Sequence, residues 1–195
     1  MSTEIRQLIE ESIAVKQAVL NDPHILAQIE TLAEKCLHSL RSGGKILFAG
    51  NGGSFADAQH LSAELTARFQ IDRAPLPSLA LGANNSAISA IGNDYGYEQV
   101  FARELHAIAR PEDLFIPITT SGNSPNILAA IEAGQRLGIT MVGLTGQEGG
   151  RMKSLCDCIC IPSKVTARIQ ECHILVGHIL CGLIESRYFA PDNAD

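Results

Sequence analysis

A loop rich in hydroxyl groups, TTSGNS at residues 119–124, precedes a predicted helix near the middle of the chain. Pro125 suits the first position of a helix, so Ser124 is expected at the N-cap. Helix N-termini attract anions through free N–H groups, and hydroxyls add donors without bulk. The loop therefore predicts either a phosphate site or, more simply, a capped turn made of ordinary turn residues. The hydroxyls available to a phosphate belong to Thr119, Thr120, Ser121 and Ser124.

A second loop, GNGGS at residues 50–54, follows the apolar run KILFA. Gly50 and Gly52 match the first two glycines of the dinucleotide-binding pattern G-x-G-x-x-G, but Phe55 occupies the third glycine position. No lysine accompanies the hydroxyl loop, so a nucleoside triphosphate site of the Walker type is not expected. Ser54 and Asp57 have the spacing of a capping pair. The simplest interpretation of this loop is a tight turn that opens a helix.

The helix predicted after the glycine loop carries titratable side chains. Its sequence, ADAQHLSAELTARF, places His60, Glu64 and Arg68 four residues apart, which puts them on one helix face. By itself this spacing is typical of a solvent-exposed ladder of ion pairs. The position of the helix favours a role in a site instead, because ligands bind at the carboxyl ends of strands in open α/β sheets.

Further candidates lie in the C-terminal stretch RIQECHILVGH, which holds Gln170, Glu171, His173 and His178 among apolar residues. A histidine in such surroundings is most often a packed, hydrogen-bonded core residue. Gln170 and His178 are about 12 Å apart along an ideal helix with a rise of about 1.5 Å per residue. They reach a common ligand only if both side chains lean inward.

Five short apolar runs form the framework for these loops. The runs are KILFAG, PSLALG, DLFIPIT, TMVGLTG and CDCICIP. Each is short enough for a buried strand, and helical stretches lie between most of them. Alternating strands and helices predict an α/β fold of three layers, α/β/α, around a five-stranded parallel sheet.

Helices flank this framework at both ends of the chain. The first forty residues predict two helices, separated by Asp22 as an N-cap and Pro23 at the first helical position. The sequence SGG at residues 42–44 ends the second helix. Residues from about 166 to 188 predict a long apolar-rich helix. The polar tail PDNAD, residues 191–195, is expected to fray.

Composition restricts the class of protein. A length of 195 residues with 46% hydrophobic residues fits one folded domain. A net charge of −6 without a basic run, together with the absence of Trp, argues against direct nucleic-acid binding. The longest apolar runs fall short of the roughly 18 residues of a membrane helix, and no signal peptide is visible. A cytoplasmic protein without membrane contact is therefore expected.

Six cysteines are expected to be thiols in that compartment. Three of them, Cys156, Cys158 and Cys160, alternate with other residues in the run CDCIC. A metal site is one interpretation, but zinc sites usually use the spacing C-x2-C. The alternation predicts one face of a buried strand, where cysteine behaves as a small hydrophobe.

Taken together, these segments resemble the sugar isomerase (SIS) domain family. The matching segments are GNGGS-x-AD-AQH-x-x-AEL, IGNDYGY, TTSGNS-x-N, LTG-x-x-GG and ARIQE-x-H-x-x-x-x-H-IL, in this order between residues 44 and 184. The resemblance implies a flavodoxin-like fold, with residues 1–195 forming a single SIS domain. Residues 1–42 would then be an added helical segment that packs on this domain or on a partner subunit.

The resemblance also implies an activity. It predicts an aldose–ketose isomerase that converts D-sedoheptulose 7-phosphate to D-glycero-D-manno-heptose 7-phosphate through an enediol, a step toward ADP-heptose and the lipopolysaccharide core. Glu64 and His178 match the proton-transfer pair, with Glu64 assigned as the base at carbon. The implied ligands of one zinc ion per subunit are His60, Glu64, Gln170 and His178. The implied substrate-binding residues are Asn51, Gly52, Gly53, Ser54, Glu64, Asn93, Asp94, Thr119, Thr120, Ser121, Ser124 and Gln170.

Members of the family build this site between the subunits of a homotetramer, so a homo-oligomer that binds a small sugar phosphate is expected. Three positions depart from the family pattern. Phe55 replaces a small residue in the glycine loop, and Thr119 replaces a frequent serine while keeping the hydroxyl. Ala167 occupies a position that is aspartate in some members, so any role of that carboxylate is missing here.

The main alternative is a non-catalytic SIS protein that binds a replication initiator protein. The C-terminal helix of that protein also reads ARIQE, but the protein lacks the matching glutamate and the last histidine. This chain retains His60, Glu64 and His178, which favours the enzyme. A regulator that senses sugar phosphates is a third alternative, and no DNA-binding extension is apparent.

Overall fold

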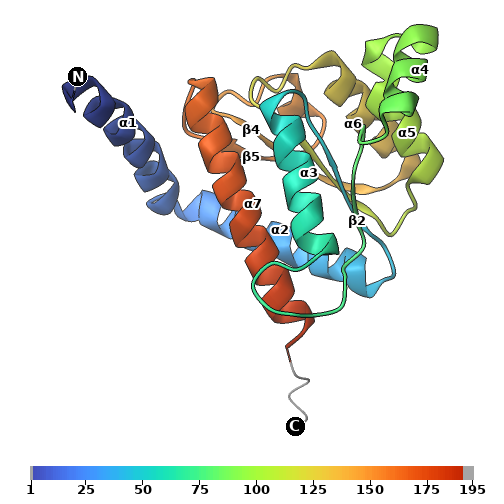
Figure 1. Ribbon diagram of the computed structural model, residues 1–195, viewed down its shortest axis with the longest axis horizontal. Helices are drawn as coiled ribbons and strands as arrows, with labels where there is room; N and C mark the ends of the chain where they lie inside the picture. Colours follow the sequence, from blue (N-terminus) through green and yellow to red (C-terminus); the bar gives the residue numbers. More distant parts are fainter. Residues whose placement is uncertain (1, 191–195) are drawn as a thin grey trace.

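The computed structural model describes residues 2–190, so the tail predicted to fray lies outside the described residues. Figure 1 shows the described helices around a central sheet. The α-helices are α1 (Ser2–Leu20), α2 (Pro23–Arg41), α3 (Gly53–Thr66), α4 (Asn85–Tyr95), α5 (Val100–Ile108), α6 (Pro125–Leu137) and α7 (Thr166–Tyr188). The strands are β1 (Ile46–Ala49), β2 (Ser78–Ala80), β3 (Leu114–Thr119), β4 (Thr140–Gly146) and β5 (Asp157–Ile161). Two short 3-10 helices are η1 (Tyr97–Gln99) and η2 (Arg151–Ser154).

The strands form one parallel sheet in the order β2-β1-β3-β4-β5. Helices cover both faces, and for this reason β1 and β3 are buried along their whole length. The predicted three-layer architecture and its flavodoxin-like strand order are therefore confirmed. Parallel pairing also brings the carboxyl ends of β1 and β3 to one edge of the sheet.

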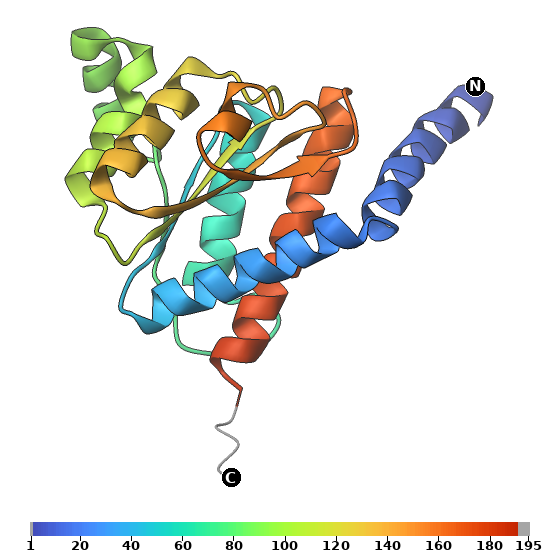
Figure 2. The same ribbon diagram turned by 180° about the vertical axis from the view of Figure 1, so that it is seen from behind.

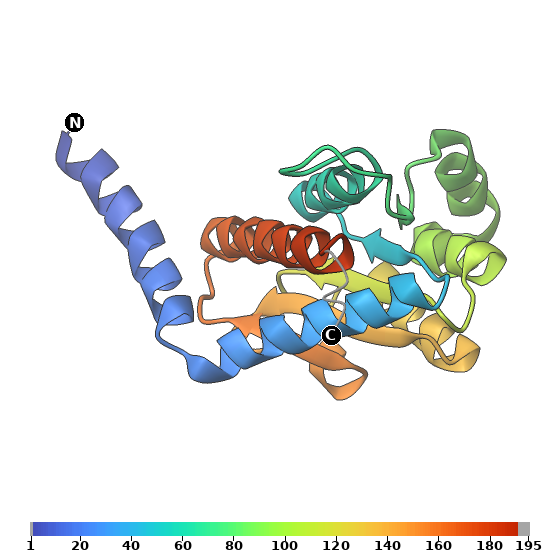
Figure 3. The same cartoon turned by 90° about the horizontal axis from the view of Figure 1, so that it is seen from below.

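Two hydrophobic cores lie on opposite faces of the sheet. Residues of α2, α3 and α7 pack with Phe48 and Ile116 on one face. Residues of α5 and α6 pack with Leu47 and Phe115 on the other face. Successive strand residues point to opposite sides, so β1 and β3 contribute to both cores. Figure 3 shows α3 and α7 side by side in the first of these layers.

The cysteine run forms part of the edge strand β5. Cys158 is buried in the core beneath α5 and α6, and Cys156 and Cys160 pack against that core while partly exposed. The predicted strand face is therefore confirmed. All six cysteines are free.

The predicted break between the first two helices is confirmed at Asp22. Its side chain accepts hydrogen bonds from the backbone N–H groups of His24 at 2.9 Å and Ile25 at 3.3 Å, and Pro23 opens α2. Gly43, with a φ of 82°, follows the end of α2 as predicted. Local capping therefore sets the bounds of α2 at both ends.

The helix α1 extends away from the rest of the domain (Figure 2). It is attached near the first turns of α7, where Ser12 Oγ donates to Glu171 at 2.6 Å and Arg168 donates to the carbonyl oxygen of Leu8 at 2.7 Å. Few neighbours cover its apolar side chains. The exposed apolar residues of α1 include Ile5, Leu8, Ile9 and Ile13.

The helix α7 has the bounds that the sequence predicted. Among the described residues it is also the one helix long and apolar enough, by length and composition, to cross a membrane, although no such segment was expected. In the fold it packs against α2 and α3, and 44% of its most apolar window is buried. Its apolar character therefore serves the core of the domain.

Close contact between α3 and α7 depends on Gly177. A Cβ atom at this position would lie 2.5 Å from the side chain of Leu61, nearer than real Cβ contacts come. The missing side chain lets the two helices approach. Gly182 lies further along α7 and has room, because a Cβ there would meet Phe69 at 3.6 Å.

We predict that Gly177→Ala lowers the free energy of unfolding by about 1–3 kcal/mol, because the added methyl group overpacks the contact with Leu61. Gly182→Ala is the matched control and should leave stability unchanged or raise it by up to about 1 kcal/mol, through higher helix propensity. Denaturant unfolding followed by circular dichroism measures both variants. Equal stability of the two variants would contradict a close contact at Gly177.

Candidate active site

The two predicted loops lie side by side at the carboxyl ends of β1 and β3. A reciprocal amide pair joins them: Asn51 Nδ2 donates to Asn126 Oδ1 at 2.9 Å, and Asn126 Nδ2 donates to Asn51 Oδ1 at 2.8 Å. The hydroxyl of Tyr97 also donates to Asn51 Oδ1 at 3.2 Å. No role was predicted for Asn126 or Tyr97 from the sequence, although Asn126 lies in the motif TTSGNS-x-N and Tyr97 in the motif IGNDYGY.

The hydroxyls of the TTSGNS loop are gathered at the start of α6. Thr119 Oγ1 lies 2.8 Å from Ser124 Oγ and 3.5 Å from Ser121 Oγ. Ser124 occupies the N-cap position as predicted, but its side chain makes no capping hydrogen bond, because it bonds Thr119 instead. The side-chain cap that the simpler interpretation required is therefore not formed. The cluster of hydroxyls lies where a helix N-terminus favours an anion.

Gly122 shapes this loop against the segment that follows β4. Its φ is +67°, and a Cβ atom there would lie 2.0 Å from the carbonyl oxygen of Gly149. The Gly122 carbonyl accepts a hydrogen bond from Met152 N at 3.0 Å, and Asn123 Oδ1 accepts one from Arg151 N at 2.9 Å. The LTG-x-x-GG motif and the two residues that follow it therefore pack against the hydroxyl loop and hold its conformation.

A pocket of about 230 Å³ opens beside the same loop. Its lining includes Ser121, Ser163 and Lys164. The Nζ atom of Lys164 lies 2.7 Å from Glu148 Oε1. The loop has no lysine near it in sequence, but the fold brings Lys164 to its pocket.

The predicted capping pair of Ser54 and Asp57 does not form. Gly52 takes the N-cap position of α3 with a φ of 55°, which leaves Ser54 buried within the first turn. One carboxylate oxygen of Asp57 is buried without a hydrogen-bond partner among the described residues. Burial raises the pKa of Asp57, and the nearby His60 and His178 partly offset that rise.

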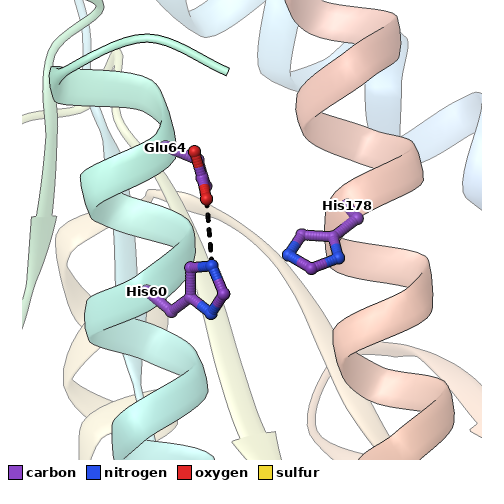
Figure 4. Close-up of side chains that lie close together, drawn as sticks. All are labelled: His60, Glu64 and His178. Carbon is purple, nitrogen blue, oxygen red and sulfur yellow. Dashed lines mark hydrogen bonds and ion pairs between the residues drawn. The ribbon is translucent and has the colours of Figure 1, made fainter. Parts of the chain in front are cut away.

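Three titratable side chains converge between α3 and α7 (Figure 4). His60 Nε2 lies 2.9 Å from Glu64 Oε1, and the ring centroids of His60 and His178 are 5.0 Å apart. One ligand atom from each of the three side chains lies within 4.8 Å of the others. The side chains of His60 and Glu64 are 49% and 24% exposed, so a ligand can reach them. Such a group can hold a divalent metal ion or exchange protons with a substrate.

Arg68 lies beyond the end of α3, and Gln170 lies beside the start of that helix. Because α3 ends at Thr66, Arg68 is not on the helix. The prediction that His60, Glu64 and Arg68 share one helix face is therefore wrong for Arg68. The amide nitrogen of Gln170 lies 2.7 Å from the position that a Cβ of Gly53 would take, at the first turn of α3. Within one chain, the structure brings together three of the four predicted metal ligands, and Gln170 borders the glycine loop.

His173 is a packed core histidine, as its apolar surroundings in the sequence predict. It is buried, and its Nε2 lies 3.1 Å from the carbonyl oxygen of Thr145. Burial lowers the pKa of His173 to about 4, so the ring is neutral near pH 7.

Asn93 and Asp94 lie on α4, where Asn93 Nδ2 donates to Asp94 Oδ1 at 2.8 Å. Both are exposed, and no residue of α4 is buried. Figures 1 and 3 show α4 at the end of the domain away from α7. In a single chain the pair is therefore not beside His178.

Known proteins match this chain in sequence and in fold. The SIS domain family model matches residues 9–146. The phosphoheptose isomerase of Aneurinibacillus thermoaerophilus is 53% identical over 190 residues, covering 97% of this chain and 96% of that protein. A phosphoheptose isomerase structure from Francisella tularensis has a TM-score of 0.89 at 36% identity, covering 94% of this chain and 97% of that chain. One from Neisseria gonorrhoeae has a TM-score of 0.88 at 38% identity, covering 95% and 98%.

We predict that Ser124→Ala weakens phosphate binding with little loss of stability. Because the hydroxyl makes no cap, the free energy of unfolding should fall by no more than about 1 kcal/mol, the worth of its bond to Thr119. The dissociation constant of inorganic phosphate, measured by NMR titration, should rise about tenfold through the loss of a charge-assisted hydrogen bond.

Ser186→Ala, at an exposed serine on α7, is the control and should change neither quantity. A Ser124→Ala variant that melts several degrees lower and binds phosphate as tightly as the parent would assign the hydroxyl to the fold alone.

Proposed function

This chain belongs to the SIS domain family and, within it, to the phosphoheptose isomerases, and from that premise we propose that it interconverts D-sedoheptulose 7-phosphate and D-glycero-D-manno-heptose 7-phosphate. The observation that carries the proposal is the proximity of the Glu64 carboxylate to the His178 imidazole. These residues lie on α3 and α7, which both begin at the edge of the sheet that carries the hydroxyl loop. The relatives of that name match over nearly their whole length. They do not favour the non-catalytic alternative.

The proposed chemistry moves a proton between C1 and C2 of the open-chain sugar. The Glu64 carboxylate takes a proton from C1 of the ketose while His178 donates one to the C2 carbonyl oxygen. The resulting enediol returns its C1 hydroxyl proton to His178 and receives the proton held by Glu64 at C2. The product is an aldose, and both residues regain their starting states. A carboxylate and an imidazole suit these roles, because their surroundings can tune both toward neutral pH.

We propose that the hydroxyl loop binds the phosphate of the sugar. In support, several hydroxyls lie together at the N-terminus of α6, and the Ser124 hydroxyl bonds Thr119 instead of capping that helix. Residues 51–54 of the glycine loop, together with Gln170 beside it, would hold the sugar hydroxyls. Asn93 and Asp94 are the further proposed hydroxyl ligands, and their distance from His178 in one chain favours a site completed by another subunit.

The donor set of His60, Glu64 and His178 fits a divalent metal ion, and we propose one zinc ion per subunit. The clustering of their ligand atoms within 4.8 Å supports this, as do the two imidazoles and one carboxylate. Bound there, the ion would supply a Lewis acid for the sugar oxygen. Glu64 and His178 cannot bind the ion and move protons with the same atoms at the same time, so the ion would either give up a ligand during turnover or serve a structural part. Gln170, the fourth proposed ligand, would have to turn away from Gly53 to reach it.

We also propose that copies of the chain associate through α1, as a homotetramer. Ile5, Ile9 and Ile13 are 61%, 55% and 57% exposed, and they lie along one helix that has few other contacts with the domain. Apolar stripes of this kind usually mark contacts between proteins. The six free thiols fit a reducing compartment, so we place the enzyme in the cytoplasm.

We predict that the purified protein converts sedoheptulose 7-phosphate to an aldose, followed by a reducing-sugar assay or NMR. Glu64→Gln should lower kcat by about 10²–10⁴-fold, because it removes the base while keeping the shape of the side chain. Its fold, measured by circular dichroism, should not change.

Glu132→Gln, at an exposed glutamate of α6, is the control and should retain full activity. An active Glu64→Gln variant would show that another group takes the proton. No turnover by the parent protein, combined with tight binding to a replication initiator protein, would revive the alternative.

We predict that protein purified without added metal contains zinc, measured by elemental analysis, and that His60→Gln reduces the zinc content. Chelation should lower activity. If the oligomer stays intact in size-exclusion chromatography, the ion acts in catalysis, and if the oligomer splits, the ion holds subunits together. Protein free of zinc whose rate does not respond to added zinc would leave Glu64 and His178 as a metal-free acid–base pair.

A further inference from the structure

Hydrogen bonds to the buried carboxylate of Glu185 hold the segment after α3 against α7. Glu185 lies on α7 with 3% of its side chain exposed. Its oxygens accept hydrogen bonds from the backbone N–H groups of Phe69 at 3.0 Å, Gln70 at 2.7 Å and Ile71 at 3.2 Å. Arg73 Nε donates a fourth at 2.9 Å. Burial alone would raise the pKa of Glu185, but these donors hold it below its usual range.

The same arginine closes the end of α3. Arg73 Nη1 donates to the carbonyl oxygens of Leu65 at 2.7 Å and Ala67 at 3.1 Å, and Nη2 donates to that of Glu64 at 2.8 Å. Carbonyl groups at the end of a helix lack partners within the helix and favour a positive charge. Arg73 therefore ties the last turn of α3, which carries Glu64, to Glu185 on α7.

Phe69, held by this arrangement, lies against His178. The two ring centroids are 5.7 Å apart and the ring planes make an angle of 27°, which is a stacked arrangement. The ring of His60 adjoins the same imidazole at 5.0 Å, edge to face. His178 is thus contacted by a ring from α3 and by a ring from the segment that follows α3.

We propose that residues 67–74, here called the strap, position His178 for proton transfer. Phe69 is the positioning residue that orients the imidazole, and the Arg73–Glu185 pair anchors Phe69. The catalytic consequence rests on the function proposed above, whereas the positioning itself does not.

The physical need for such a strap follows from the freedom of a histidine side chain. A partly exposed imidazole on a helix has several rotamers available, and a flat ring stacked on one face excludes some of them. A displacement of about 1 Å at a reacting group can cost on the order of 10²-fold in rate. A buried ion pair is by itself weak evidence for stability. The Arg73–Glu185 pair has a further consequence, because Arg73 also bonds the end of α3 and so links the two helices that carry Glu64 and His178.

The test compares Phe69→Leu with Phe69→Tyr and Phe189→Leu. Phe69→Leu keeps apolar bulk but removes the stacked ring, so kcat should fall by about tenfold to 10²-fold. KM should stay within about twofold of the parent, because no substrate contact is lost. Phe69→Tyr keeps the ring and should restore kcat. The ring of Phe189 lies 5.7 Å from Arg73 Cζ and does not stack on His178, so Phe189→Leu keeps the stacked ring and should lower kcat less than Phe69→Leu does.

A spectroscopic readout separates positioning from a merely structural role. In ¹H–¹³C spectra of protein labelled at histidine, loss of the Phe69 ring current should move the Hε1 resonance of His178. The resonance of His173, buried against Thr145, should stay in place. This measurement needs no turnover.

An unchanged kcat together with an unchanged His178 resonance in Phe69→Leu would overturn the proposal. Glu185→Gln keeps the shape of the anchor while removing its charge, and it should reproduce the effects of Phe69→Leu. Should Glu185→Gln fail to fold, the Phe69 variants decide alone. If the parent protein shows no isomerase activity, the proposed function fails, and the His178 resonance still decides whether the strap positions the ring.

Discussion

The close contact between α3 and α7 at Gly177 is the constraint on which the candidate site depends. Both helices begin at the carboxyl edge of the sheet and lie side by side on one face (Figures 1 and 3). Leu61 fills the space that a side chain at position 177 would take. Leu61 lies between His60 and Glu64 in sequence, and His178 directly follows Gly177. Any widening of this contact would therefore separate the acid–base group itself.

The second constraint is the edge of a parallel sheet. Neighbouring strands end together, so the loops after β1 and β3 must share space and satisfy one another's polar groups. The amide pair of Asn51 and Asn126 does this across the two loops. Ser124 bonds Thr119 rather than its own helix, which leaves the N-terminus of α6 without a side-chain cap. The backbone N–H groups at the start of α6 are thereby left available, whereas a capping side chain would have bonded one of them.

Sequence patterns predicted the helices and strands well, but they predicted capping hydrogen bonds and shared helix faces less well. The N-cap at Asp22 formed as predicted, because its partners lie within three residues of it in the chain. The capping pair of Ser54 and Asp57 did not form, because the glycine loop let α3 begin at Gly53 and drew Ser54 into the first turn. The predicted face of His60, Glu64 and Arg68 lost its last member, because α3 ends before Arg68.

By itself, the sequence determined the periodic features: which runs are buried strands, where α2 and α7 begin and end, and which motifs resemble a sugar isomerase. These depend on neighbours along the chain, and hydrophobic periodicity and caps record such neighbours. The tertiary structure decided which distant side chains meet. It placed His178 beside Glu64, Phe69 on His178 and Gln170 beside Gly53. No local pattern encodes these contacts, because each depends on how two helices pack across the same face of the sheet.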